Sequence, residues 1–325
     1  MEKLLDEIES YWSTRTEGYS EVNHKELAGT QKNAWLKVLT SQFPDKPKEE
    51  IRILDIGTGP GFFPVILAEA GYHVDAVDYT EGMLEKAKEN AGELCRNIHF
   101  QRMDAQKLEF EDNTFDVVIS RNLTWNLEHP DVAYREWVRV LKVGGKLLNF
   151  DANWYGYLYE EEQRKAYEND RKNVENNSLD DHYLCTDIER MERIALQVPL
   201  SKIRRPEWDV KTLREAGLLG IHTDTEIWKT VWSEEERLNY QSTPMFMVTG
   251  VKPDHFLNLP VVEGEKTEGF LEIGDGEFTL PATIIRGKNP GKTVLVTAGL
   301  HAGEYVGIQT LIELSKRLKP EKVKG

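Results

Sequence analysis

The chain has 325 residues, of which 39% are hydrophobic and 30% are charged, and its formal net charge is −15. This composition is ordinary for a globular protein and long enough for two domains. The acidic balance disfavours a nucleic-acid partner, which generally needs a basic footprint.

Other broad classes are also disfavoured. No apolar run approaches the roughly 20 residues that span a bilayer, so we expect no membrane partner. The start "MEKLLDEIES" lacks the pattern of a signal peptide. Cys95 and Cys185 stand far apart, which argues against a disulfide framework and a cysteine zinc site. We therefore expect a cytoplasmic protein with a small-molecule substrate, and its oligomeric state stays open.

The first 45 residues are expected to be helical, and strands and helices alternate from Ile51 onward. This alternation predicts a doubly wound, mainly parallel, Rossmann-like α/β sheet of seven strands. The stretch at about 154–205 is polar and rich in aromatic residues, which predicts a helical insertion. The seven expected strands cover residues 51–57, 72–78, 98–104, 115–120, 144–151, 221–228 and 244–251.

A composition change near Lys252 predicts a domain boundary, with one domain at 1–252 and a small α/β fragment at 253–325. In this fragment, residues 270–274, 280–287 and 292–299 are expected to be strands. A helix is expected at about 304–318.

The most informative stretch is "ILDIGTGPG" at 53–61, a strand that runs into three glycines at alternate positions. Glycines after a strand let backbone N–H groups approach a ligand, and ligands bind at the carboxyl ends of parallel strands. The dinucleotide fingerprint G-x-G-x-x-G fails, since Phe62 stands in place of its third glycine. Asp55 would also repel a pyrophosphate but suits a ligand with an amine and a sulfonium.

Acids follow the next two expected strands as well. Asp78 ends the strand at 72–78 and can accept hydrogen bonds from ribose hydroxyls. Asp104 ends the strand at 98–104, where it could flank an adenine.

Four ordered motifs carry a resemblance: "ILDIGTGPG", "VDAVDYTEGML", "RMDAQKLEFEDNTFDVVISRN" and "EWVRVLKVGGKLL". Through these motifs, the part of the chain from about residue 10 to residue 250 resembles class I S-adenosylmethionine-dependent methyltransferases. "YWSTRTEGY" at 11–19 also resembles the N-terminal lid of that family. The resemblance implies that S-adenosylmethionine is the cofactor. It implies cofactor contacts for Asp55, Gly57, Thr58, Gly59, Gly61, Asp78, Tyr79, Met83, Asp104, Ala105, Arg121, Asn122, Tyr11, Trp12, Arg15 and Tyr19.

Methyl transfer needs orientation more than a catalytic triad. The tetrad of amino-directed DNA methyltransferases is absent after the fourth strand, where "RNLTWNL" stands, and this favours a small-molecule acceptor. The catalytic candidates are Asn122, Trp125 and Asp151. Aromatic rings beside carboxylates suit an amine or amino-acid-like acceptor. They predict a substrate site at Asn153, Trp154, Tyr155 and Tyr157, although the rings could equally pack the insertion onto the sheet.

The stretch 293–318 resembles the opening of the succinylglutamate desuccinylase/aspartoacylase family of zinc hydrolases. His301 and Glu304 match the first two metal ligands of that family. The third ligand would lie downstream of Gly325, so zinc is expected only in a completed domain.

Two other functions stay open beside the methyltransferase. One is an NAD-dependent oxidoreductase, which Phe62 and Asp55 disfavour. The other is a cofactor-binding or scaffold protein without turnover.

Overall fold

The computed structural model describes residues 4–183, 186–274, 276–289, 291–299 and 305–325. The chain divides into two compact units, Met1–Lys252 and Pro253–Gly325. Because none of the helices in the described ranges is both long and apolar enough, none could cross a membrane.

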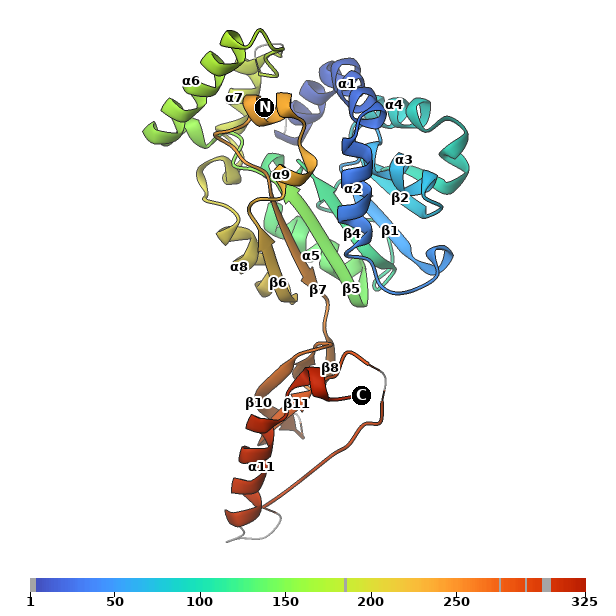
Figure 1. Ribbon diagram of the computed structural model, residues 1–325, viewed down its shortest axis with the longest axis vertical. Helices are drawn as coiled ribbons and strands as arrows, with labels where there is room; N and C mark the ends of the chain where they lie inside the picture. The colour runs from blue at the N-terminus through green and yellow to red at the C-terminus, as the bar shows by residue number, and fades with distance from the viewer. Residues whose placement is uncertain (1–3, 184–185, 275, 290, 300–304) are drawn as a thin grey trace. The chain divides into compact units, whose positions relative to one another are not determined.

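The elements of the first unit alternate between helices and strands as expected (Figure 1). In chain order they are α1 (Leu4–Ala28), α2 (Gln31–Thr40), η1 (Lys48–Glu50), β1 (Arg52–Ile56), α3 (Phe62–Glu69), β2 (His73–Asp78), α4 (Glu81–Ala91), η2 (Gly92–Asn97), β3 (Ile98–Arg102), β4 (Phe115–Arg121), η3 (Thr124–Asn126), α5 (Pro130–Val140), β5 (Leu141–Asp151), η4 (Gly156–Leu158), α6 (Glu161–Asn176), α7 (Ile188–Ala195), η5 (Pro199–Lys202), α8 (Glu207–Glu215), β6 (Leu219–Asp224), α9 (Trp228–Val231), α10 (Glu234–Asn239) and β7 (Phe246–Val251).

Seven of the described strands form one sheet in the order β3-β2-β1-β4-β5-β7-β6. The strands β1 to β5 are parallel, and β7 runs antiparallel to both of its neighbours. This is the predicted doubly wound, Rossmann-like arrangement, which is confirmed. The sixth strand is shorter than expected, because the chain turns after Asp224 and enters α9 at Trp228.

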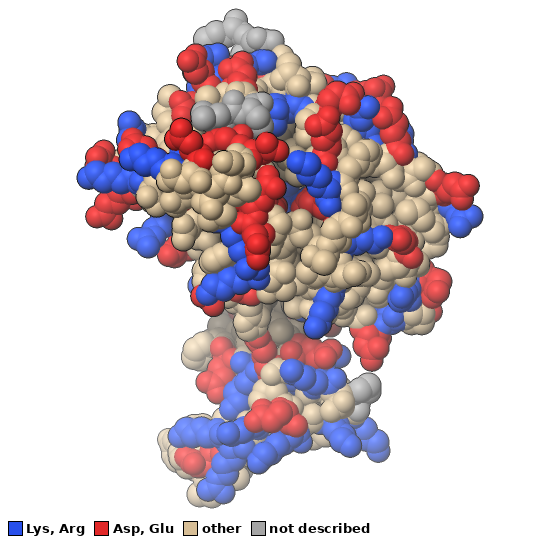
Figure 2. All heavy atoms as spheres, turned by 45° about the horizontal axis from the view of Figure 1, so that its top comes forward, with Lys and Arg blue, Asp and Glu red and all other residues tan. Residues whose placement is uncertain are grey.

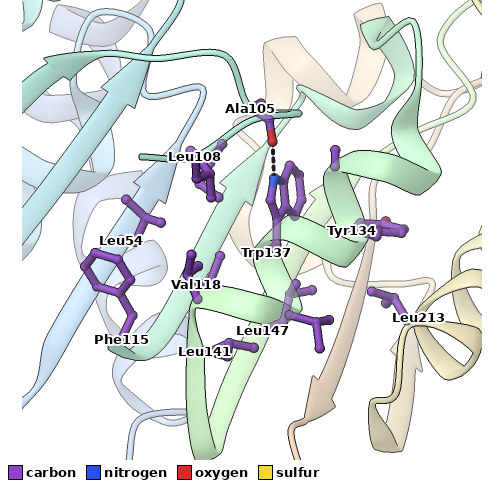
Figure 3. Close-up of a cluster of buried hydrophobic side chains, with 14 of the residues drawn as sticks. Leu54, Ala105, Leu108, Phe115, Val118, Tyr134, Trp137, Leu141, Leu147 and Leu213 are labelled. Carbon is purple, nitrogen blue, oxygen red and sulfur yellow. Dashed lines mark hydrogen bonds between the residues drawn. The ribbon is translucent and has the colours of Figure 1, made fainter. Parts of the chain in front are cut away.

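Apolar residues cover both faces of the sheet. On one face, α5 packs on β5, and α8 packs on β6 and β7, through Tyr134, Trp137 and Leu213, which are fully buried (Figure 3). On the other face, α2 and α3 pack through Trp35 and Ile66. Burial of both faces explains why the central strands show apolar runs without alternation.

The second unit has much less buried surface. It comprises β8 (Asp254–Phe256), β9 (Leu259–Val261), β10 (Lys266–Ile273), β11 (Phe278–Ile285), α11 (Tyr305–Arg317) and η6 (Pro320–Lys322). Strands β10 and β11 form an antiparallel hairpin, and no residue of α11 is buried.

The prediction of a strand at 292–299 is wrong, since residues 291–299 form no regular element. Val294 and Leu295 are 78% and 81% exposed. A strand needs a neighbour to pair with, and an apolar, β-branched run by itself does not provide one.

Candidate functional site

The carboxyl ends of three strands meet at one edge of the sheet. Ile56 at the end of β1 pairs with Val77 of β2 and with Ser120 of β4. The segments that follow these strands begin at Gly57, Tyr79 and Asn122, so they start side by side at this edge.

The glycine loop between β1 and α3 is tightly turned. Gly57, Gly59 and Gly61 have φ angles of +70°, +54° and +90°, which side chains rarely adopt. A Cβ on Gly61 would lie 3.0 Å from the Ala87 Cβ on α4, and a Cβ on Gly57 would lie 2.7 Å from Leu123. Gly61 is therefore constrained by close packing as well as by its backbone angle, whereas at Gly57 the Leu123 side chain could move.

Asp78 connects this loop to β2. One carboxylate oxygen accepts the Gly59 N–H at 2.9 Å, and the other accepts the Thr80 N–H at 2.8 Å. Burial raises the pKa of the Asp78 carboxyl, although these backbone donors oppose the shift. Each oxygen keeps acceptor capacity beyond these two bonds.

One cavity occupies this edge of the sheet. Most of the residues predicted to contact the cofactor line it, namely Trp12, Tyr19, Gly57, Gly59, Asp78, Tyr79, Met83, Asp104, Ala105, Arg121 and Asn122. Glu9, Asp78, Asp104 and Glu128 give the lining four acids, against the single base Arg121. This balance favours a cationic ligand.

The segment around Asp104 is held in place by hydrogen bonds within the segment and from α5. The Asp104 carboxylate accepts the Gln106 N–H at 2.8 Å. Trp137 on α5 donates its indole N–H to the Ala105 carbonyl at 2.9 Å, which ties the segment to the core (Figure 3). The residues 104–106 are thus held in place at the cavity wall.

Helix α1 covers the cavity and is tied to both sides of it. Trp12 donates its indole N–H to Asn126 Oδ1 at 2.6 Å, and Glu9 pairs with Arg102 of β3 at 2.8 Å. Tyr19 lies beside Gly59, within 3.5 Å of where its Cβ would be. The resemblance of 11–19 to a lid thus agrees with the position of the helix, but Arg15 does not line the cavity.

Arg121 is mostly buried and is neutralised within the protein. It forms a two-pronged ion pair with Glu26 of α1 at 2.8 and 3.0 Å. Its guanidinium also lies 4.7 Å from the centre of the Phe62 ring. Its charge is therefore shared with Glu26 and is not free for an anionic ligand.

The segment after β4 carries two polar atoms that are buried and lack a hydrogen-bond partner within the described part of the chain. These are Asn122 Oδ1 and Asn126 Nδ2. Both residues line the cavity, and Asn122 has a φ of +56°. Buried polar atoms are normally bonded, so this acceptor and this donor are available to a ligand or to water.

Several predicted contacts lie elsewhere. Asp55, Thr58, Gly61 and Tyr11 are outside the cavity lining. Asp55 is 3% exposed, and burial raises the pKa of its carboxyl to about 7. Gly61 contacts α4, and Tyr11 packs in an aromatic cluster with Trp125 and Tyr155.

The predicted catalytic role of Asp151 does not fit the structure. Asp151 is fully buried, and its carboxylate accepts four donors: the N–H groups of Trp125 and Ala152, the Trp154 indole and the Arg205 guanidinium. Trp125 also lies outside the cavity lining, and its indole N–H is bonded to the Asn122 carbonyl at 3.0 Å. Of the three candidates, only Asn122 faces the cavity.

The predicted substrate residues belong to the core of the insertion. Asn153 bonds to both backbone groups of Arg205, and Tyr157 stacks on Tyr167 with ring centres 4.1 Å apart. Tyr155 and Tyr157 are 8% and 5% exposed, so the rings pack the insertion and do not line the cavity. The packing alternative therefore describes this cluster.

No group of three potential metal ligands occurs in the described ranges. His301 and Glu304, the two predicted zinc ligands, lie outside the described residues.

Sequence reasoning missed part of the lining. The missed residues are Leu5, Ile8, Glu9, Ile56, Val77, Thr80, Met103, Gln106, Leu123, Asn126, Leu127 and Glu128. Those adjacent to the motifs could have been found from their position beside Asp78, Asp104 and Asn122. Glu9 carries no local signal, because its place depends on how α1 packs.

Comparisons with known proteins agree with the fold and the motifs. Residues 54–149 match a family described as a methyltransferase domain. A demethylmenaquinone methyltransferase of Clavibacter sepedonicus is 39% identical over 97 residues, which are 30% of this chain and 39% of that protein. A ubiquinone biosynthesis O-methyltransferase of Coxiella burnetii is 30% identical over 126 residues, which are 38% of this chain and 53% of that protein.

A solved structure shares the fold. Haemonchus contortus phosphoethanolamine N-methyltransferase 2, in complex with S-adenosyl-L-methionine, has a TM-score of 0.50 and 20% identity. The match covers 68% of this chain and 53% of that one. The matches span between 39% and 60% of the length of the curated relatives compared with this chain.

These findings agree with the motifs, since residues 54–149 are similar to methyltransferase domains. The match does not reach the second unit. The resemblance of 293–318 to zinc hydrolases therefore stays a prediction.

Proposed function

We propose that the first unit transfers a methyl group from S-adenosylmethionine to a small-molecule acceptor. The observation that carries this proposal is the cavity where Gly59, Asp78 and Asp104 meet at the carboxyl edge of the sheet. At this cavity the backbone at Gly59 can approach a ligand closely, the Asp78 carboxylate can accept hydrogen bonds from a ribose, and the lining is acidic.

The lining suits this cofactor. The spare acceptor capacity of Asp78 would hold the ribose hydroxyls. Tyr79, Met83, Met103 and Ala105 provide an apolar wall for the adenine. The excess of acids suits the ammonium and sulfonium charges, whereas it would repel the pyrophosphate of NAD.

Bound S-adenosylmethionine supplies a methyl carbon that its sulfonium already activates. The chain therefore has to orient the reactants and exclude water. Trp12 and Tyr19 on α1 cover the cavity, and Asn122 and Asn126 face it with amide atoms that have no partner in the described part of the chain. Asn122 is the residue that we expect nearest to the reacting groups.

The acceptor is proposed as a small molecule without a narrower class. The rings that suggested an amine acceptor are packed in the insertion core. The net charge of −15 supports a small molecule over a nucleic acid. On the face drawn in Figure 2, acidic and basic side chains of the first unit are interspersed.

The test is calorimetry of the full chain with S-adenosylhomocysteine and, separately, with NAD. We expect micromolar binding of S-adenosylhomocysteine and none of NAD. Binding of NAD alone would overturn the proposed methyltransferase function and favour an oxidoreductase instead. Transfer of label from S-adenosylmethionine into a metabolite extract would then distinguish an enzyme from a cofactor-binding protein without turnover.

A further inference from the structure

We propose that Arg205 is a positioning residue that holds the segment 122–126 against the cavity. The inference rests on the proposed function, because it concerns the placement of a wall of that same site. Arg205 lies outside the lining, in the turn between η5 and α8.

Arg205 is fully buried between two carboxylates that are also fully buried. Its Nη1 donates to Asp151 Oδ2 at 2.7 Å. Its Nε and Nη2 donate to the two oxygens of Asp209 at 2.8 and 2.6 Å. The rigid guanidinium fork thus joins the end of β5 to α8 through one side chain.

Two chains of hydrogen bonds connect Arg205 to η3. In the first, the Asp151 oxygen that pairs with Arg205 also accepts the Trp125 N–H at 3.0 Å. The backbone of η3 is therefore one bond away from the ion pair.

The second chain begins at Asp209, which accepts the Tyr134 hydroxyl. Asn149 donates to that hydroxyl at 2.8 Å, and its own oxygen accepts the Thr124 hydroxyl at 3.0 Å. Consecutive residues of η3 are thus fixed, one by its backbone and one by its side chain, through partners of the same guanidinium.

The placement of this segment affects a ligand directly. Asn122 Oδ1 and Asn126 Nδ2 are an acceptor and a donor at the cavity that have no partner among the described residues. Asn126 also accepts the Trp12 indole N–H, so η3 sets the position of the covering helix as well. A shift of this segment would change the contacts that Asn122 and Asn126 offer to a ligand, and also the position of α1 over the cavity.

The Arg205 triad is weak evidence for a role in stability, because replacing a buried ion pair by apolar residues is often neutral or stabilising. Its partners lead to the cavity wall, which is the feature that a positioning role would require.

The test compares Arg205→Lys and Thr124→Val with Asp116→Asn in the full chain. Lysine keeps the charge but cannot bridge both carboxylates with one fork. Thr124→Val removes only one hydroxyl at the far end of the network and is the milder change. Asp116 is a matched buried carboxylate, paired with Lys46 and Lys142 at 2.7 Å, at the opposite end of β4.

We expect Arg205→Lys to weaken S-adenosylhomocysteine binding about tenfold and Thr124→Val to weaken it severalfold. Hydrogen exchange of the amides at 122–128 should be faster in both variants. Asp116→Asn should lower the melting temperature but leave the affinity and the exchange at 122–128 unchanged.

Unchanged affinity and exchange in both test variants would overturn the proposal, as would equal losses in Asp116→Asn. If Arg205→Lys does not fold, Thr124→Val decides between these outcomes. If the wild-type chain binds no S-adenosylhomocysteine, the proposed function fails instead, and the exchange at 122–128 still tests the positioning.

Discussion

Trp12 and Asn126 are joined by a 2.6 Å hydrogen bond between residues 114 positions apart in the chain. The bond connects the covering helix α1 to the segment after β4, and both residues line the same cavity. It also fixes the orientation of the Asn126 amide, because an indole N–H can only donate. The Asn126 Nδ2 is thereby left as a donor without a partner in the described residues.

This contact predicts the effect of Trp12→Phe. Phenylalanine keeps an aromatic ring but removes the N–H, so α1 should close less firmly over a ligand. A lost hydrogen bond of this kind corresponds to about 0.5–1.5 kcal/mol, or a roughly two- to tenfold weaker affinity. Calorimetry with S-adenosylhomocysteine measures it.

Trp228→Phe is the matched control, since Trp228 lies on α9 and outside the lining. Its affinity should equal that of the wild type. Equal affinity in Trp12→Phe would show that the indole bond does not contribute to closure.

Asp78→Ala is expected to weaken S-adenosylhomocysteine binding by about 1–3 kcal/mol, the range for leaving hydrogen-bonding groups unpaired. The change removes a proposed ribose acceptor and also frees the Gly59 and Thr80 N–H groups. Asp75→Ala on the same strand is the control, because Asp75 pairs with Arg52 and His99 outside the lining. Equal affinities in the two variants would remove Asp78 from the site.

Much of the fold follows from local sequence. The apolar runs of the central strands and the glycines after β1 predicted the sheet, its order of elements and the edge that carries the cavity. The failures have one cause in common, since they concern segments whose structure depends on distant partners. Residues 291–299 have strand propensity but no regular element, and Trp228 begins a helix instead of ending a strand.

The same distinction applies to the site. Asp78, Asp104 and the loop glycines are adjacent to strand ends, so their spacing sufficed to place them. Asp151 has the same local signal, at the end of β5. Its role depends on Arg205, 54 positions away, which no local pattern indicates.

Glycine substitutions separate backbone strain from close packing. Gly61 and Gly71 have φ angles of +90° and +93°, but only Gly61 would bring its Cβ against Ala87. A Cβ at Gly71 would meet nothing within 4 Å. Each alanine should cost about 1–2 kcal/mol for the backbone, and Gly61→Ala about 1–3 kcal/mol more for the clash.

Urea denaturation of both variants measures this difference. Equal losses of stability would mean that α4 yields to the added methyl group without cost.

The last prediction concerns pH and the buried carboxyl of Asp55. Burial raises the pKa of this carboxyl in the folded state to about 7, from its ordinary value of 3.8. The folded protein therefore retains a proton that the unfolded chain releases between these two values. The stability contributed by this proton is fully present below about pH 4 and falls as the pH rises towards 7.

Asp55→Asn should remove this contribution to the pH dependence, because an amide of the same shape does not titrate. With about 1.4 kcal/mol per pKa unit, the loss between pH 4 and pH 7 amounts to at most about 4 kcal/mol. Other carboxyls titrate in the same range, and the Asp116 pKa is shifted the opposite way by its lysine partners. The informative quantity is therefore the difference between variant and wild type. Urea unfolding from pH 4 to pH 8 should show the variant gaining stability relative to the wild type as the pH rises. A constant difference would mean that Asp55 is ionised in the folded protein throughout this range.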